Sequence, residues 1–356
     1  MVRLIITYIA ITALLFSCDT SIQPNQTCDM VNANGEGIFV LCEGLYGYNN
    51  ATLWFSDMTN SEDVFSCANN GRKLGDTAND LLKINDSTFA IIVSSSNEVF
   101  VCNRKGKIIR AGYIPESGHF LKKGALFNDS ILFISDLYAD LIWKVNLISM
   151  KFDTLINNTL CAPDGIEIHE NILAICNSGY GVFRYKEPYA GTVLFYDLNT
   201  KKSIVKTIGP NVQNITYSPK TQSWLAQYSH LTTQKDSIGG LVELSALNYQ
   251  VKSFQRGKYS SKVILAQDQS ALYAIVDNSL YRRSIENDVF SEKIDLILRN
   301  ETIDSWYRVF LLKNSLCIFN AGNFMVNGNI MIVDPEKKIL SSRISVGLNP
   351  NTLISM

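Results

Sequence analysis

A short apolar run of the kind that forms β-strands recurs seven times along the chain, at intervals of roughly 45 residues. The seven copies are Gly37–Val40, Thr88–Ile91, Ile131–Ile134, Ile172–Ile175, Ser223–Ala226, Ala271–Ala274 and Ser315–Ile318. A period of about 40–50 residues with several short strands in each unit is typical of a β-propeller, whose blades have four strands. The repeat predicts an all-β, seven-bladed β-propeller over residues 37–356.

The two ends of the predicted propeller complement each other. The first unit begins at Gly37 with a second strand and lacks an innermost one, whereas blade two has its innermost strand predicted at Leu81–Ile84. The chain ends on the pattern of an outer strand, a Gly-x-Asn-Pro turn at 347–350, and an inner strand reaching Ile354. We therefore expect the C-terminal strand to complete blade one, which removes the free sheet edges of an open ring.

The N-terminus has the pattern of an export signal. Arg3 supplies the positive charge, and Leu4–Leu15 is an apolar run of twelve residues, which is too short to span a bilayer comfortably. The run ends in Leu15-Phe16-Ser17-Cys18, which resembles the bacterial lipobox, although Phe16 departs from the small or β-branched residue that is usual there.

This resemblance implies that residues 1–17 are a lipoprotein signal peptide and that Cys18 is lipidated. The polar residues 18–36 then form a flexible tether, and the protein is anchored at the outer membrane or cell surface without spanning it. The alternative is an ordinary cleaved signal followed by an incidental cysteine.

Charge and motif content exclude several classes of function. The net charge is −1 and no basic stripe occurs, so nucleic-acid binding has no support. No catalytic triad order, HExxH motif, phosphate loop or dinucleotide fingerprint is present, so we predict no enzyme, no cofactor and no metal. Seven cysteines follow Cys18, without zinc-like spacing; most fit buried apolar positions, and one disulfide, for example through Cys28 or Cys67, remains open.

Two features resemble a known family. Val346-Gly347-Leu348-Asn349-Pro350 and Tyr196-Asp197-Leu198-Asn199-Thr200-Lys201 are similar to the repeats of YncE-like seven-bladed propellers. Gly37–Gly44 and Asn70–Asp76 resemble a branch of surface lipoproteins of Bacteroidetes type, the BtuG-like proteins, some of which capture cobalamin and pass it to a TonB-dependent transporter. The resemblance implies capture of a corrinoid or a similarly bulky nutrient, with such a transporter as partner.

The loops that join second to third strands gather on one face of a propeller, around its channel. Five of the seven carry an aromatic residue beside Gly, Ser, Asn or Asp. Flat rings and amide donors suit a large, partly apolar ligand such as a corrin, a haem or a glycan, although Tyr and Asn also suit any exposed turn. The predicted ligand-binding residues are Glu43, Tyr46, Tyr48, Tyr138, Asn177, Tyr180, Tyr228, His230 and Phe324.

Two further interpretations stay open. One is a protein-interaction propeller with no small ligand. The other is a calcium-dependent, lactonase-like enzyme, since Pro163-Asp164-Gly165 resembles the strand entries of lactonase propellers, and the oxygens of Glu43, Asn177 and Asp277 would suit calcium. Of the histidines, His119 and His230 fall in loops expected at the channel face, and His169 falls on the opposite face.

Overall fold

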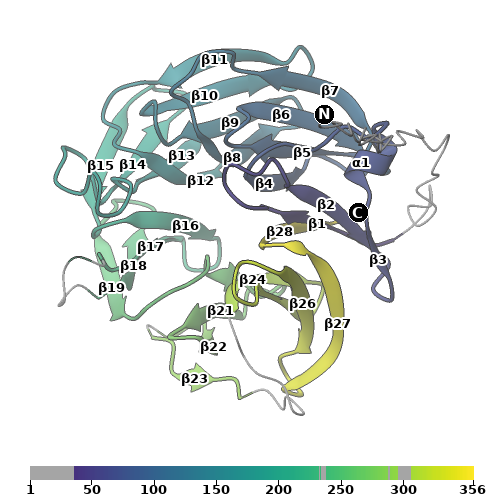
Figure 1. Ribbon diagram of the computed structural model, residues 1–356. Coiled ribbons are helices and arrows are strands. Elements are labelled where there is room, and N and C mark those ends of the chain that lie inside the picture. The colour runs from purple at the N-terminus through teal and green to yellow at the C-terminus, as the bar shows by residue number, and fades with distance from the viewer. Residues whose placement is uncertain (1–35, 232, 234–237, 288, 296–305) are drawn as a thin grey trace, which may run out of the picture.

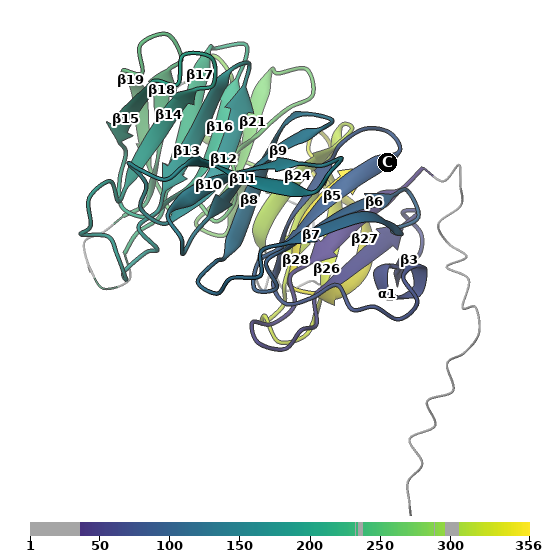
Figure 2. The same ribbon diagram turned by 90° about the horizontal axis from the view of Figure 1, so that it is seen from above.

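Seven four-stranded antiparallel sheets surround a central axis in the computed structural model (Figure 1). The structure describes residues 36–231, 233, 238–287, 289–295 and 306–356. The predicted signal peptide, Cys18, Cys28 and the tether up to residue 35 lie outside this part of the chain. Seen from above, the strands of each blade run between two faces of the ring, where loops join them (Figure 2).

The blades follow one another in chain order. Blade one contains β28 (Pro350–Ser355), β1 (Ile38–Cys42), β2 (Thr52–Ser56) and β3 (Ser61–Asp63), and α1 (Phe65–Ala68) follows it; blade two contains β4 (Ala78–Lys83), β5 (Thr88–Val93), β6 (Glu98–Asn103) and β7 (Ile108–Tyr113). Blade three contains β8 (Leu121–Asn128), β9 (Ile131–Asp136), β10 (Leu141–Asn146) and β11 (Lys151–Ile156); blade four contains β12 (Pro163–His169), β13 (Ile172–Asn177), β14 (Thr192–Asp197) and β15 (Ser203–Thr207). Blade five contains β16 (Val212–Ser218), β17 (Ser223–Tyr228), β18 (Gly240–Ser245) and β19 (Val251–Arg256). Blade six contains β20 (Ile264–Leu265), β21 (Ala271–Val276), β22 (Ser279–Ser284) and β23 (Glu292–Lys293); blade seven contains β24 (Trp306–Leu312), β25 (Ser315–Asn320), β26 (Asn327–Asp334) and β27 (Ile339–Leu348).

The C-terminal strand closes the ring. β28 pairs antiparallel with β1, with Leu353 opposite Val40. The chain turns from β27 into β28 at Asn349, whose backbone has φ of 54° and whose carbonyl accepts a hydrogen bond of 2.8 Å from the Glu43 amide. The predicted all-β, seven-bladed propeller with a C-terminal strand in blade one is confirmed.

The seven apolar runs of the sequence form the second strands of the blades. Blades stack face to face, so a second strand has a neighbouring blade on each side, and β5 is buried from Phe89 to Val93. The outer strand β7 instead alternates half-buried and exposed residues along its length. Aromatic rings fill the space between blades: Phe39 of blade one lies 4.8 Å from Phe89 of blade two between ring centroids.

Six of the seven innermost strands, all but β20 of blade six, have a β-bulge near their start. In blades two to five and blade seven the pairing register with the second strand shifts there, and in blade one it shifts between Leu41 and Cys42, opposite Asn351. A bulge re-aims a side chain, because two residues of one strand oppose one residue of its partner. In these strands the bulge brings polar residues to the channel end of each blade.

Bulge residues also join one blade to the next. Asn351 donates through Nδ2 to the Asn79 carbonyl at 3.2 Å, and Lys122 donates through Nζ to Asn79 Oδ1 at 3.2 Å. Gly165 of blade four lies so close to blade five that a Cβ there would come within 2.1 Å of the Gln213 carbonyl oxygen. The inner ends of the blades are therefore tied together, and the channel wall is a fixed structure.

Candidate functional site

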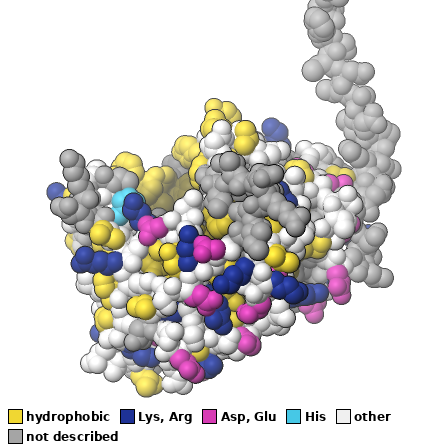
Figure 3. Space-filling view, turned by 90° about the horizontal axis from the view of Figure 1, so that it is seen from below, with side chains coloured by type: hydrophobic (Ala, Val, Ile, Leu, Met, Phe, Trp, Pro, Cys, Tyr) yellow, Lys and Arg dark blue, Asp and Glu magenta, His cyan; other side chains and the backbone are white. Residues whose placement is uncertain are grey.

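The loops between second and third strands carry most of the exposed aromatic side chains. On these loops the described exposed large apolar residues are Tyr46, Tyr48, Tyr138, Tyr180, Phe183, Tyr189, Ile238, Phe324, Met325 and Val326. Figure 3 shows hydrophobic side chains standing out along its upper edge, the side that faces the viewer in Figure 1. A contiguous group of exposed apolar side chains on a folded domain is a candidate interaction surface.

Four rings from blades three and four form a continuous group, which we call the aromatic patch: Phe120, Tyr138, Tyr180 and Phe183. The Tyr138 and Tyr180 rings meet edge to face with centroids 5.6 Å apart, and their hydroxyl oxygens are 3.3 Å apart. Phe183 stacks on Tyr180 at 4.9 Å, and Phe120 lies 4.9 Å from Tyr138. Phe183 is 74% exposed, so the patch offers a flat apolar face to solvent.

The Tyr138 phenol of the patch stays protonated over the physiological range. The hydrogen bond with Tyr180, then burial and the nearby Tyr46 phenol, raise the pKa of Tyr138 to about 12. Because one hydroxyl proton lies between the two oxygens, the other remains available to an acceptor on a ligand. The patch thus combines ring faces with a neutral hydrogen-bond donor.

An ion-pair clamp fixes the long loop that carries Tyr180 and Phe183. Arg184 donates to both carboxylate oxygens of Asp140, at 2.9 and 2.6 Å, and to Glu187 Oε2 at 2.9 and 2.7 Å. The hydrogen bonds to Asp140, and then the one to Glu187, raise the pKa of Arg184, and the hydrogen bond from Arg184 lowers the pKa of Glu187. Asp140 also accepts the Ala162 amide at 2.6 Å, so the loop of blade four is held against blade three. Sequence reasoning missed this clamp.

The blade-one loop presents Tyr46 and Tyr48, which are 71% and 69% exposed. Its backbone is held by side chains, since Gly47 donates to Asp76 Oδ2 at 2.8 Å. Phe324 of the blade-seven loop is exposed and packs edge-on against Tyr307 at 5.5 Å. Of the predicted site residues, Tyr46, Tyr48, Tyr138, Tyr180 and Phe324 therefore lie exposed on the loop face, and Tyr138 and Tyr180 touch.

Other predicted site residues are engaged within the protein. Asn177 is fully buried; it accepts the Cys161 amide at 3.2 Å and donates to Thr159 O and Thr192 Oγ1 at 3.1 and 3.0 Å. Tyr228 is half-buried and stacks on Phe254 at 6.3 Å, and burial raises its pKa. Glu43 and His230 are half-buried at the starts of their loops.

Two of the histidines have structural partners. His119 Nδ1 lies 2.6 Å from Asp136 Oδ2, which also accepts the Trp143 indole N–H at 3.0 Å, so His119 belongs to a network inside blade three. His169 stacks on Tyr217 with ring centroids 3.6 Å apart.

Metal and thiol chemistry find little support in the described part of the chain. No group of three or more His, Cys, Asp or Glu side chains is placed to hold a metal ion among those residues. Cys42, Cys102, Cys161, Cys176 and Cys317 are free and buried, as predicted for most cysteines. Cys67 is disulfide-bonded, which answers the question that the sequence left open for this residue.

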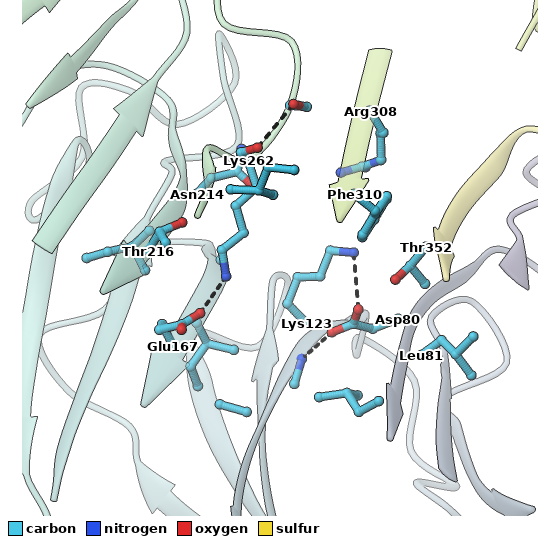
Figure 4. Close-up of a pocket in the computed structure, with 18 of the residues that line it drawn as sticks. Asp80, Leu81, Lys123, Glu167, Asn214, Thr216, Lys262, Arg308, Phe310 and Thr352 are labelled. Carbon is cyan, nitrogen blue, oxygen red and sulfur yellow. Dashed lines mark hydrogen bonds and ion pairs between the residues drawn. The ribbon is translucent and has the colours of Figure 1, made fainter. Parts of the chain in front are cut away.

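A second candidate site lies in the central channel, which sequence reasoning missed. It is a cavity of about 590 Å³ lined by the innermost strands of all seven blades. Asp80, Asn214, Arg308 and Thr352 follow the bulges of their strands at equivalent register positions, and Lys123 lies in the bulge of blade three. Figure 4 shows these side chains directed into the cavity.

Comparison with known proteins defines the fold class. No family model and no curated protein matches the chain. Solved structures match it as propellers: the Neurospora crassa Pan2 WD40 domain (TM-score 0.55, 11% identity, 78% of this chain and 80% of that one) and Kuenenia stuttgartiensis hydrazine synthase (0.55, 12%, 77% and 93%). An extracellular domain from B. thetaiotaomicron also matches (0.52, 13%, 79% and 37%). At these identities the likeness shows the fold alone.

The protein is thus a seven-bladed β-propeller, and this fold suits a binding or interaction role. Within the described residues, no helix has the length and apolar character needed to cross a membrane.

Proposed function

We propose that this protein is a non-catalytic binding protein of the outer membrane or cell surface, held there through a lipid on Cys18. It captures a corrinoid, or a nutrient of similar bulk, on its loop face and delivers it to a TonB-dependent transporter. The YncE-like and BtuG-like sequence resemblance suggests the ligand and the partner. One structural observation carries the proposal: the exposed aromatic patch, held in place by the Arg184 clamp.

The patch supports binding of a large planar ligand for two reasons. Its rings are already packed against one another, so little side-chain entropy is lost when a flat molecule covers them. The exposed tyrosines of the blade-one loop add rings and hydroxyls that match the apolar ring and peripheral amides of a corrin.

Titration of the purified protein with cobalamin by calorimetry tests the proposal. We expect saturable heat and a rise in melting temperature, and we expect the double variant Tyr180→Ala, Phe183→Ala to weaken binding at least about tenfold, since aromatic anchors carry much of the energy at such sites. Tyr113→Ala is the matched control: Tyr113 is 64% exposed, but it lies on the outer strand β7. Absence of heat and of thermal stabilisation would reject corrinoid capture.

A protein partner without a small ligand is the second candidate. Phe324, Met325 and Val326 are consecutive, and all three are exposed, at 45, 65 and 52%. Such a protruding apolar segment suits insertion into a groove of another protein. Co-purification of a membrane protein from cells, lost in Met325→Asp and retained in the double variant of the aromatic patch, would favour this candidate over ligand capture.

A further inference from the structure

Four cations and two carboxylates line the central channel, and one of the cations lacks a carboxylate partner among the described residues. The charged residues that line the cavity are Asp80, Lys83, Lys123, Glu167, Lys262 and Arg308. Lys262 pairs with Glu167 across the channel, Lys123 Nζ lies 3.5 Å from Asp80 Oδ1, and Lys83 pairs at 2.8 Å with Asp86 at the exposed hairpin that follows β4. Within the described residues, Arg308 has no carboxylate partner.

The Arg308 side chain is directed into the channel, and one of its buried hydrogen-bond donors lacks an acceptor among the described residues. Its Nε is buried and lacks a partner in the described part of the chain, and its guanidinium carbon lies 5.7 Å from the centroid of the neighbouring Tyr307 ring. Figure 4 shows its side chain extending from β24 toward the space above Lys123. A buried guanidinium donor without an acceptor costs free energy, which an anionic acceptor in the channel would recover.

The excess of positive charge in the channel also acts on Lys123. Burial lowers its pKa, and the charges of Arg308 and Lys122 lower it further, while Asp80 and Asp164 act in the opposite direction. Lys123 and Arg308 are 185 positions apart in the chain. The closed ring of blades brings these two cations to one cavity.

Part of the wall is apolar. One step further along the innermost strands, half-buried Leu82, Leu126, Ile168, Ile264 and Phe310 face the same cavity. A volume of about 590 Å³ is that of a small-molecule site. The walls suit the apolar body of a ligand, and the polar ring suits its charged end.

We propose that the central channel is a second binding site, which takes a small molecule with one carboxylate and an apolar body. The carboxylate accepts hydrogen bonds from the Arg308 guanidinium, the group whose planar fork matches it best. A single negative charge matches the one cation without a carboxylate partner, whereas the second charge of a phosphate would face no unpaired cation. This site is independent of the loop-face ligand.

Fluorescence titration with 1-naphthoate tests the site, with 1-naphthamide as the neutral counterpart of the same shape. We expect the wild-type protein to bind the carboxylate at least about tenfold more tightly than the amide, as charge-assisted hydrogen bonds to arginine imply. We expect Arg308→Gln to remove that preference. Arg256→Gln, at an exposed arginine on the outer strand β19, should leave it unchanged.

Three results would overturn the proposal: equal affinity for naphthoate and naphthamide, full affinity of Arg308→Gln for naphthoate, or tighter binding of inorganic phosphate than of naphthoate. Arg308→Lys controls for loss of folding, because it keeps the positive charge and removes the planar guanidinium. It should bind naphthoate with affinity between those of the wild type and Arg308→Gln, and wild-type affinity in this variant would contradict recognition by the guanidinium.

Discussion

Arg283 of β22 and Glu243 of β18 form an ion pair of 3.0 Å that is almost completely buried between blades six and five. Their side chains are 1% and 6% exposed, and Ser253 and Lys252 also approach the Glu243 carboxylate. Next along the chain, Arg282 makes an ion pair with Glu292 at 3.1 Å, but these side chains are 30% and 46% exposed. The protein therefore contains a buried and an exposed arginine pair at adjacent positions.

This adjacency permits a matched comparison of stability. Glu243→Gln removes the charge that compensates Arg283, so we expect the free energy of unfolding to fall by about 3 kcal/mol. Glu292→Gln removes a solvated partner, and we expect a change of no more than about 1 kcal/mol. Urea denaturation of the two variants measures both values, and equal effects would show that burial of the Arg283 pair is not important for stability.

The closing strand should be essential for folding. Deleting residues 349–356 removes β28, which supplies the innermost strand of blade one and the Asn351 side chain that binds blade two. We expect the truncated chain to lose its cooperative thermal transition, measured by circular dichroism. Deletion of Ser355 and Met356 alone is the control and should cost only a few degrees; an unchanged melting temperature in the longer deletion would argue against closure by β28.

Lys123 should contribute a pH-dependent term to stability. Burial, with Arg308 and Lys122, lowers its pKa from 10.5 to about 8 in the folded protein, despite Asp80 and Asp164. Below pH 8 both folded and unfolded chains hold the proton; between about pH 8 and 10.5 the unfolded chain holds more protons, so folding gains stability as the pH rises.

The stability difference between wild type and Lys123→Met isolates this term, because other groups are common to both proteins. We expect the wild type to gain about 3 kcal/mol relative to the variant between pH 8 and 10.5. Urea unfolding at several pH values measures the difference. A difference that stays flat across this range would mean that the Lys123 ammonium is not destabilised in the channel.

The Arg184 clamp should matter more for binding than for stability. Arg184→Gln removes partly exposed ion pairs to Asp140 and Glu187, so we expect a loss of stability of no more than about 1 kcal/mol. The loop of 178–191 would lose its fixed position, and we expect protease cleavage within it to accelerate and cobalamin affinity to fall about five- to tenfold. Arg282→Gln, with a similarly exposed arginine, is the control for both measurements.

The sequence revealed those parts of the fold whose pattern is set by burial on both faces. The second strands are continuous apolar runs because a blade covers each side, so their recurrence was easy to read. The innermost strands are harder, because a bulge and a charged residue interrupt them: the strand predicted at Leu81–Ile84 is in fact β4, Ala78–Lys83. That prediction therefore missed the bulged Asn79 and the channel-facing Asp80.

The residues of the candidate site also differ in how well the sequence predicts them. Tyr46, Tyr138 and Tyr180 could be placed on the loop face because each lies in the loop that follows a second strand. Asn177 is the last residue of its strand β13, and its side chain binds the backbone of its own blade. The sequence pattern of an Asn at a strand end does not distinguish this role from ligand binding. The Arg184–Asp140 pair spans 44 positions, a separation that carries no local pattern.

The bulges of the innermost strands separate two roles that most strands must combine. Residues around a bulge hold the pairing register and the packing between blades, while the side chain that follows it lines the channel. Substitution at such a position alters charge and shape in the channel, while the backbone bulge still sets the register of the blade. Ligand preference could thus diverge among descendants of this chain one blade at a time, by single codon changes, while the propeller itself stays the same.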